Sequence, residues 1–258
     1  PRHLFLNKEV IKHFDEILVF LMERESLLPT PPINLLEHDK YLFNKHFKER
    51  SEVEKHTYGH LHAEKVFSQH TLFKISKNEL NTEKVASIIK DFKPDLCFIF
   101  GVGLILDPTF AVLPKEKINL HLGLSPWFKG SATLFWPFYH LMPQFCGSTF
   151  HYISKEADAG EIIHQCVPKL EIGDGIHDVG AKCVLKAAKD LPLILDYWKR
   201  QKTFKTIKQK TSGRNWRGID FHASQLRLIY DLFENKIVDK YLEGKLVQKV
   251  PNLYSCFN

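Results

Sequence analysis

The sequence predicts an α/β fold in which a mostly parallel, twisted sheet carries helices on both faces and a small helical appendage follows at the C-terminal end. Short apolar runs such as 95–100 (DLCFIF) are typical of strands buried on both faces of a sheet. Segments with apolar residues at helical spacing separate these runs. This alternation of strand and helix favours right-handed crossovers and therefore a parallel sheet.

The N-terminal part contributes a helix, a strand and a second helix. Helical spacing over 4–20 runs into a continuous apolar stretch at 17–22, which predicts a strand. Because the chain opens at Pro1 and enters this pattern at once, we expect that a first strand is missing. A proline-rich linker at 27–33 leads to a predicted helix at 39–55.

The middle of the chain repeats strand and helix. Residues 71–75 resemble a strand. A helix is predicted between Asn81 and Pro94, since asparagine favours a helix start and proline ends a helix. Apolar runs at 95–100 and 117–121 predict two further strands.

A loop rich in Gly, Ser and Pro follows at 123–131. Ligands of open parallel sheets bind beyond the carboxyl ends of the strands, so this loop is a candidate site. Two more strands are predicted at 146–153 and 161–170, with a turn at 156–160 between them.

The C-terminal part is predicted to be helical. Apolar residues at helical spacing predict a helix at 178–199, broken or kinked at Pro192, and a helix or helix pair at 224–242. We therefore expect a core at 1–198, followed by a basic linker and a small appendage at 199–258.

Composition excludes several classes of protein. The 258 residues are 44% hydrophobic and 26% charged, which excludes a disordered or collagen-like chain. The sequence shows neither an apolar run long enough to cross a bilayer nor a secretion signal, so we expect no membrane contact and a cytoplasmic location. Five scattered cysteines without a CxxC pair are typical of free thiols in that compartment. The net charge of +6 favours an anionic ligand, in particular one with phosphate groups.

Several cofactor motifs are incomplete or missing in the sequence. Residues 101–103 (GVG) lack the third glycine of a dinucleotide loop, because Leu106 stands in its place. Neither a P-loop nor a GxSxG motif is present. His56, His60 and His62 are interpreted as surface histidines, and no metal is predicted.

One group of polar residues combines an amide, an imidazole and a carboxylate. Asn119 and His121 lie two residues apart in a predicted strand, so both side chains point to one face near its carboxyl end. Asp158, in the turn between the next two strands, could fix the tautomer of His121 and raise its pKa. Acyl transfer to an amine needs these groups: Asn stabilises an oxyanion and His moves the proton of the amine. An ordinary turn network is the competing interpretation.

Two sequence blocks around these residues resemble the folate-dependent formyltransferases, which include the glycinamide ribonucleotide, methionyl-tRNA and nucleotide-sugar enzymes. INLHLGLSPWFKGS (118–131) is similar to the family's Asn-x-His strand and loop, and GSTFHYISKEADAGEIIHQ (147–165) to its Thr/Ser-x-His strand and Asp loop. With FIFGVGLIL (98–106), the resemblance covers about 95–195. It implies a Rossmann-like formyltransferase core.

The resemblance implies that 10-formyltetrahydrofolate donates the formyl group as a co-substrate, and that the group passes directly to a primary amine through a tetrahedral intermediate. It implies that Asn119, His121 and Asp158 are the catalytic residues. The family often has Ser where this chain has Gly123, so one side-chain contact is lost. Backbone groups of two loops would hold the folate; their residues here are Leu104, Ile105, Leu106, Ser154, Lys155, Glu156, Ala157 and Asp158.

The acceptor is less constrained than the donor. About 60 residues follow Tyr197, fewer than the C-terminal barrel of the transfer-RNA enzymes, and the opening lacks the phosphate loop of the glycinamide ribonucleotide enzymes. PRHLFLN at the start, MERE at 22–25 and the tail at 210–233 resemble the nucleotide-sugar enzymes. We therefore expect an amino sugar on a nucleoside diphosphate, of the GDP-perosamine type used for O-antigen and lipopolysaccharide.

Four residues are candidates for binding this substrate, with core packing or a solvated basic surface as the competing interpretation: Thr149, Trp127, Lys129 and Arg214. Lys210 and Arg217 could also meet a diphosphate. His151 could line the site beside Thr149, or it could be a structural histidine of the sheet.

Other functions stay open. Residues 199–210 carry six Lys or Arg and no acid, which suits a solvated connector or an RNA-binding module. A folate-binding protein without transferase activity is a further alternative, and a deformylase, which transfers the formyl group to water, is the nearest enzymatic rival. Apolar faces on the C-terminal helices favour a homodimer.

Overall fold

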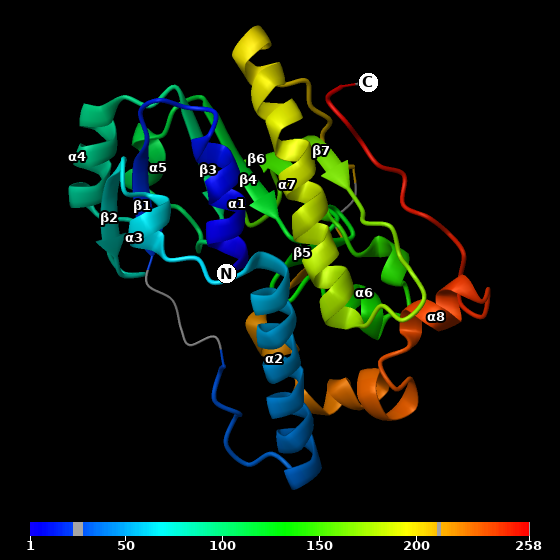
Figure 1. Cartoon of the computed structure of the whole chain (residues 1–258). Helices are drawn as coiled ribbons and strands as arrows, with labels where there is room; N and C mark the ends of the chain where they lie inside the picture. Colours follow the sequence, from blue (N-terminus) through cyan, green and yellow to red (C-terminus); the bar gives the residue numbers. More distant parts are fainter. Residues whose placement is uncertain (23–27, 211–212, 258) are drawn as a thin grey trace.

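The structure is a computed structural model that describes residues 1–22, 28–210 and 213–257. Most of the MERE segment, the first residue of the predicted linker and two residues of the tail therefore lie outside the described residues. The main sheet has the strand order β3-β4-β6-β7 (Figure 1). Its strands are β3 (Leu96–Phe100), β4 (Glu116–His121), β6 (Ser148–Tyr152) and β7 (Ile162–Cys166).

Among the described residues, three strand pairs are parallel and two are antiparallel. β3 runs parallel to β4, β1 (Leu18–Met22) to β2 (Thr71–Ile75), and β5 (Phe128–Gly130) to β8 (Arg214–Trp216). β6 pairs antiparallel with β4 on one side and with β7 on the other, and β6 and β7 form a hairpin. The predicted α/β class with a mostly parallel sheet is confirmed.

Helices cover both faces of these sheets (Figure 1). On one face, Phe98 and Phe100 of β3 join the core formed by α1 (Arg2–Ile11) and α7 (Ile176–Gln201). On the other face, Ile99 packs with α4 (Glu83–Phe92) and α5 (Thr109–Val112). The remaining helical segments are α2 (Glu37–Tyr58), α3 (Ala63–Val66), α6 (Trp136–Tyr139), α8 (Ile237–Leu242), the 3-10 turns Pro143–Phe145, Gly218–Asp220 and Ala223–Gln225, and a π turn at Leu228–Leu232. None of the described helices has the length and apolar character that a membrane span requires.

Two predicted helices differ from the structure. The helix predicted over 4–20 ends at Ile11, because the apolar residues that follow form β1 against β2. Pro192, expected to break or kink the next long helix, lies inside an uninterrupted α7. Its neighbours Leu191, Ile194 and Leu195 are fully buried, and this packing offsets the backbone hydrogen bond that proline cannot donate.

The residues after 198 pack into the same cores as the residues before them. Ile207 exchanges backbone hydrogen bonds of 3.0 and 2.9 Å with Ile162 of β7. Cys256 donates its backbone N–H to Ile163 at 2.9 Å. Trp216 stacks on Trp136 with ring centroids 3.8 Å apart. Residues after 198 therefore contribute side chains and backbone hydrogen bonds to the two main core clusters.

Candidate active site

The pairing of β4 with β6 assembles the polar centre. Ile118 and Leu120 of β4 are buried in the core on the α7 side, so the alternating Asn119 and His121 face the opposite side. The antiparallel register puts Asn119 opposite His151 and His121 opposite Thr149. The two side chains predicted to share a face therefore meet two residues from β6.

His121 is held between a carbonyl and a carboxylate. Its Nε2 lies 2.9 Å from the carbonyl oxygen of Phe128, and its Nδ1 lies 3.3 Å from Oδ2 of Asp158. Both opposing atoms are acceptors, so both contacts are satisfied together only when the ring is protonated. A Cβ at Gly123 would lie 2.4 Å from Nε2, so glycine in place of the family's serine leaves room for this ring.

Burial and neighbouring charges shift both members of this pair. Burial lowers the pKa of His121 below 6.5, and the charge of Asp158 and the bond to Phe128 counteract it only in part. Burial by itself would raise the pKa of Asp158, but His121, His151 and the Gly130 amide outweigh it and lower that pKa to about 2. Near neutral pH, the site therefore holds an ionised carboxylate beside a neutral imidazole that can accept a proton.

His151 connects Asn119 to Asp158. Its Nδ1–H donates to the carbonyl oxygen of Tyr152 at 2.8 Å, and its Nε2 lies 3.1 Å from the amide nitrogen of Asn119. The same Nε2 lies 3.4 Å from Oδ1 of Asp158. Since the Asn119 amide has a second N–H, it can hold this contact and still donate to an oxyanion.

The Asp158 loop is fixed from two sides. The backbone N–H of Gly130 donates to Oδ2 of Asp158 at 2.8 Å. The Gln209 side chain donates to the carbonyl oxygens of Asp158 and Gly160, each at 2.8 Å. Asp158 itself has a φ of 50°, a left-handed conformation that Asp adopts more readily than most residues. Part of the predicted basic connector thus holds this loop.

Thr149 holds the loop after β4. Its hydroxyl donates to the carbonyl oxygen of Gly123 at 2.7 Å and accepts the backbone N–H of Ser125 at 3.0 Å. The side chain is 0% exposed. Thr149, predicted as a substrate contact, therefore has no open surface and instead shapes the loop that carries Trp127 and Lys129.

The two loops predicted to hold folate lie together. Lys155 Nζ pairs with Asp107 Oδ2 at 2.7 Å and so links 154–158 to the segment that follows Leu106. Asn81 accepts the backbone N–H of Leu106 at 2.8 Å and donates to the carbonyl oxygen of Leu104 at 3.1 Å. Leu104 and Leu106 are 44% and 43% exposed, which leaves apolar surface that a ring system could cover.

The other predicted substrate residues flank this centre. Lys129 of β5 pairs with Asn215 of β8, next to Arg214. The Arg214 guanidinium lies 4.0 Å from the ring centroid of Trp216 and 3.5 Å from Asp220. Trp127 is 36% exposed and packs edge-on against Phe145.

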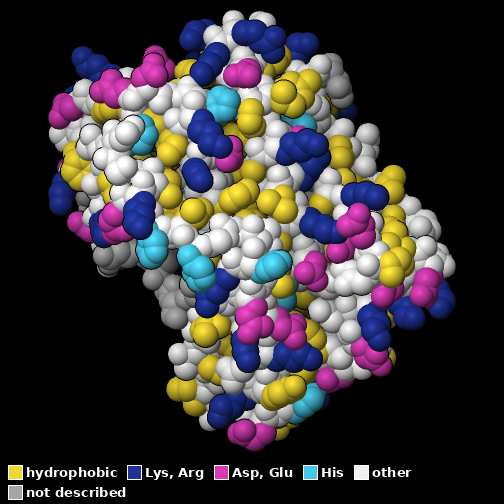
Figure 2. Space-filling model, viewed as in Figure 1, with side chains coloured by type: hydrophobic (Ala, Val, Ile, Leu, Met, Phe, Trp, Pro, Cys, Tyr) yellow, Lys and Arg dark blue, Asp and Glu magenta, His cyan; other side chains and the backbone are white. Residues whose placement is uncertain are grey.

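Basic side chains are mixed with acidic ones over the face shown in Figure 2, apart from a concentration at the end of α7, where Lys199 and Arg200 lie. A continuous basic stripe of the kind that follows a nucleic-acid backbone is not seen on this face.

Among the described residues, His164, Cys166 and Asp190 form a cluster with metal-ligating atoms. Both Asp190 oxygens lie 2.6 Å from the Lys186 ammonium, so an internal cation already neutralises that carboxylate.

Three contributors to this site were not predicted from the sequence: Gly130, Gln209 and Asn81. A fourth, His151, was predicted only as one of two alternatives. For His151 a signal existed, because the Thr-x-His spacing in β6 repeats the Asn-x-His spacing in β4. The other three act through a backbone amide or a side-chain amide from a distant segment, and no local pattern marks such contacts.

Known proteins are similar to parts of this chain. A formyltetrahydrofolate deformylase of Escherichia coli O6:H1 is 30% identical over 118 residues, which cover 45% of this chain and 40% of that protein. A methionyl-tRNA formyltransferase of Treponema pallidum is 35% identical over 96 residues, covering 36% of this chain and 28% of that protein. The chain thus matches less than half the length of these relatives.

A solved structure extends the likeness to most of the chain. The formyltransferase PseJ from Anoxybacillus kamchatkensis, in complex with UDP-4,6-dideoxy-4-formamido-L-AltNAc and tetrahydrofolate, aligns with a TM-score of 0.50 and 20% identity. The alignment covers 84% of this chain and 94% of that chain, which shows a shared fold. Residues 24–195, which include Asn119, His121 and Asp158, match the sequence profile described as formyl transferase, and the chain therefore belongs to the formyl transferase family.

Proposed function

We propose that this protein transfers the formyl group of 10-formyltetrahydrofolate to the amine of a nucleotide-linked amino sugar. The observation that carries the proposal is the convergence of Asn119, His121 and Asp158 at the end of β4, with His121 Nδ1 3.3 Å from Asp158. These groups provide an oxyanion donor, a proton acceptor and a carboxylate that stabilises the protonated acceptor.

In the proposed reaction, the amine nitrogen bonds to the formyl carbon, and the bond from that carbon to N10 of the folate then breaks. The free N–H of Asn119 donates to the oxygen that gains charge in the tetrahedral intermediate. His121 takes the proton that the amine loses, with Asp158 beside Nδ1 to stabilise the imidazolium. The same proton can return to N10, so the protein ends each cycle in its starting state.

The donor proposal is supported by the two linked loops. Leu104 and Leu106 expose apolar surface beside loop 154–158, which the family resemblance assigns to folate. Family membership and the tetrahydrofolate bound to the similar PseJ structure support the same donor.

The acceptor proposal is supported by the tail. The pairing of β5 with β8 brings Lys129 and Arg214 into one ladder, one residue out of register, and these two cations are the groups through which we expect a diphosphate to bind. PseJ carries a UDP-linked formamido sugar, which supports a nucleotide sugar here. Within that class, we propose a GDP-perosamine type of acceptor.

The test supplies formylfolate with four acceptors in parallel: a GDP-linked amino sugar, a dTDP-linked amino sugar, glycinamide ribonucleotide and methionyl-tRNA. Turnover with a sugar nucleotide alone supports the proposal. Consumption of formylfolate without any amine would identify a deformylase instead. Turnover only with one of the other two acceptors would replace the sugar assignment.

Variants of two catalytic candidates distinguish an enzyme from a protein that only binds folate or RNA. Asn119→Ala and His121→Ala are each expected to lower kcat by about 10²- to 10⁴-fold with folding intact, because each removes a group that acts in the transition state. His60→Ala, at an exposed histidine between α2 and α3, is the matched control and is expected to keep full activity. Full activity in both catalytic variants would contradict the mechanism. Salt-sensitive binding of RNA, without turnover, would favour the RNA-binding alternative.

A further inference from the structure

A row of polar side chains crosses three strands of the main sheet on the face of the candidate active site. The strand register puts His121 of β4 opposite Thr149 of β6, and Thr149 opposite Gln165 of β7. Directly opposite residues of antiparallel strands share a face, so Gln165 lies on the same face as His121. Gln165 is 4% exposed, and it has no part in the proposed reaction.

The side-chain amide of Gln165 joins two separate segments. Its Nε2 donates to the carbonyl oxygen of Ser125 at 2.6 Å, and its Oε1 accepts the backbone N–H of Tyr254 at 3.1 Å. A backbone N–H can only donate and a carbonyl oxygen can only accept, so these partners fix which end of the amide faces which segment. The backbone N–H of Gln165 also donates to the carbonyl oxygen of Tyr254 at 2.8 Å, so two hydrogen bonds hold the C-terminal segment against β7.

Thr149 and Gln165 together hold both backbone groups of Ser125. The Ser125 N–H donates to the Thr149 hydroxyl at 3.0 Å, and the Ser125 carbonyl oxygen accepts the Gln165 amide. Because Ser125 is fully buried, the loss of either partner leaves a backbone group without a hydrogen bond. The two side chains therefore fix the loop after β4 at this residue.

The position of Ser125 determines two contacts of the catalytic pair. Three residues further along the chain, the carbonyl oxygen of Phe128 lies 2.9 Å from Nε2 of His121. A backbone hydrogen bond of 2.9 Å closes the turn 124–128, so a displacement of Ser125 moves Phe128 with it. Five residues beyond Ser125, the Gly130 N–H donates to the carboxylate that faces the ring.

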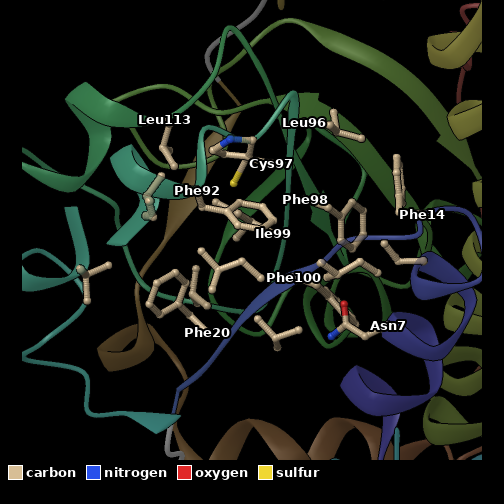
Figure 3. A pocket seen from close by; sticks show the side chains of 18 of the residues that line it. Asn7, Phe14, Phe20, Phe92, Leu96, Cys97, Phe98, Ile99, Phe100 and Leu113 are labelled. Carbon is tan, nitrogen blue, oxygen red and sulfur yellow. The ribbon is translucent and has the colours of Figure 1, made fainter. Parts of the chain in front are cut away.

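The opposite side of β4 is packed less completely. There β3 borders a cavity of about 380 Å³, which all five residues of β3 line, and each of them is only partly buried (Figure 3). By contrast, every residue of β7 and four of the five in β6 are buried. Side chains beside a void lose contacts on that side and are restrained less. The β6–β7 side is therefore the rigid part of the sheet that positions the catalytic centre.

We propose that Gln165 is a positioning residue of the formyl-transfer site: by holding the Ser125 carbonyl oxygen, its amide keeps the Phe128 carbonyl oxygen in contact with Nε2 of His121. Gln165 acts on the ring only through the loop. The kinetic part of this proposal rests on the proposed function, whereas the titration of His121 does not depend on it.

A displaced loop would change the titration of His121. The titratable groups that act on this ring are Asp158, 3.3 Å from Nδ1, and His151, whose ring centroid lies 6.4 Å away. Burial and, to a smaller extent, the second ring lower the pKa of His121, whereas the carboxylate and the Phe128 carbonyl oxygen raise it. Withdrawal of the Phe128 oxygen removes one group that favours the charged ring, so the pKa falls further.

Gln165→Met tests the amide, because methionine has nearly the same length and no N–H. We expect kcat to fall by about 10- to 100-fold and KM for formylfolate to change by less than about threefold. We expect the NMR midpoint of His121 to move to lower pH by about 0.5 pH unit, together with the acid limb of kcat/KM. An unchanged midpoint would overturn the proposal. Absence of formyl transfer in the unmodified protein would instead overturn the proposed function, and the midpoint would still test the loop.

Gln144→Met is the matched control. Gln144 is 7% exposed, and its Nε2 donates to the carbonyl oxygens of Val247 and Lys249 at 2.9 and 2.8 Å. Both variants lose buried hydrogen bonds, so both are expected to lower Tm by about 2–8 °C. Only Gln165→Met should change kcat and the midpoint of His121. Equal changes in both variants would mean that Gln165 acts through stability alone, and the proposal would be wrong.

A double-mutant cycle checks whether two side chains act through one residue. Thr149→Val and Gln165→Met both release Ser125, so their effects on ln kcat are expected to be non-additive. Fully additive effects would contradict a shared action on the loop and overturn the proposal.

The unmodified protein supplies a measurement that does not depend on the folding of any variant. The amide hydrogens of Ser125 and Tyr254 are expected to exchange at least about tenfold more slowly than those of exposed loop residues, because Thr149 and Gln165 accept them. Fast exchange at Tyr254 or at Ser125 would show that these side chains do not hold their segments, and the proposal would fail.

Discussion

The backbone N–H of Gly130 donates to Oδ2 of Asp158 at 2.8 Å, and this bond depends on residue 130 having no side chain. Gly130 has a φ of 89°, and a Cβ there would lie 2.1 Å from the carbonyl oxygen of Trp216. The pairing of β5 with β8 therefore fixes the amide, and the amide fixes the carboxylate that faces His121. A strand outside the matched family segment thus positions a residue inside it.

Replacing Gly130 with alanine is expected to lower kcat by about 10- to 100-fold, because the added carbon separates β5 from β8 and Asp158 loses a charge-assisted hydrogen bond. Steady-state kinetics with formylfolate and the preferred acceptor measure the effect. Gly218→Ala is the matched control, since a Cβ there meets nothing within 4 Å. Wild-type kcat in Gly130→Ala would show that this amide does not position Asp158.

The lowered pKa of Asp158 links this residue to acid stability. Its folded pKa of about 2 lies below the ordinary 3.8, so the stability it contributes is present above about pH 4 and is lost as pH falls toward 2. The contribution is on the order of 2 kcal/mol. Urea unfolding at pH 6 and pH 3 measures the part of this contribution that is lost above pH 3, and Asp158→Asn is expected to lose less stability over this interval than the wild type. An equal loss in both proteins would contradict the assigned shift.

The charge of Asp158 also acts on His121. Burial holds the pKa of His121 below 6.5, and the carboxylate raises it part of the way back. We therefore expect an NMR titration of His121 to show a midpoint below 6.5, and Asp158→Asn to move this midpoint to still lower pH. The acid limb of kcat/KM should move in the same direction. A midpoint that rises in Asp158→Asn would require a different partner for the ring.

Removing the Thr149 hydroxyl is expected to destabilise the fold. Thr149→Val keeps the shape of the side chain but leaves the Ser125 N–H and the Gly123 carbonyl oxygen buried without this partner. The expected loss is about 1–3 kcal/mol in chemical denaturation. Thr71→Val, on the exposed first residue of β2, is the matched control and should change stability by less than about 0.5 kcal/mol. If both variants lose the same free energy of unfolding, the hydrogen bonds of Thr149 to the loop do not stabilise the fold.

The ion pair between Lys155 and Asp107 tests the proposed folate loops. Both side chains are more than half exposed, so Lys155→Ala should change stability by less than about 1 kcal/mol. Because the pair links the two loops, we expect a several-fold rise in KM for formylfolate with kcat nearly unchanged. The double exchange Lys155→Asp with Asp107→Lys should recover most of the affinity. Lys48→Ala, in an exposed pair on α2, is the control that should leave KM unaltered.

Local patterns predicted much of the sheet and part of the site. The strand predicted at 71–75 has the same bounds as β2, and those predicted at 95–100 and 117–121 each differ from β3 and β4 by one residue. Such apolar runs are readable because burial on both faces constrains every residue of the strand. Asn119 and His121 were placed on one face because side chains alternate along a strand whatever surrounds it.

Contacts between distant segments depended on the tertiary structure. β5 and β8 have three residues each, too few for a periodic pattern, and they form because their backbones meet. Gln209 holds the Asp158 loop across 51 residues of sequence, and His151 meets Asn119 across 32. The sequence by itself determined the strands, the helices and the shared face of two catalytic candidates, because these follow from local periodicity. Only the folded chain decided that Asp158, His151 and the tail join them, because long-range contacts depend on chain packing and leave no periodic signal in the segments that make them.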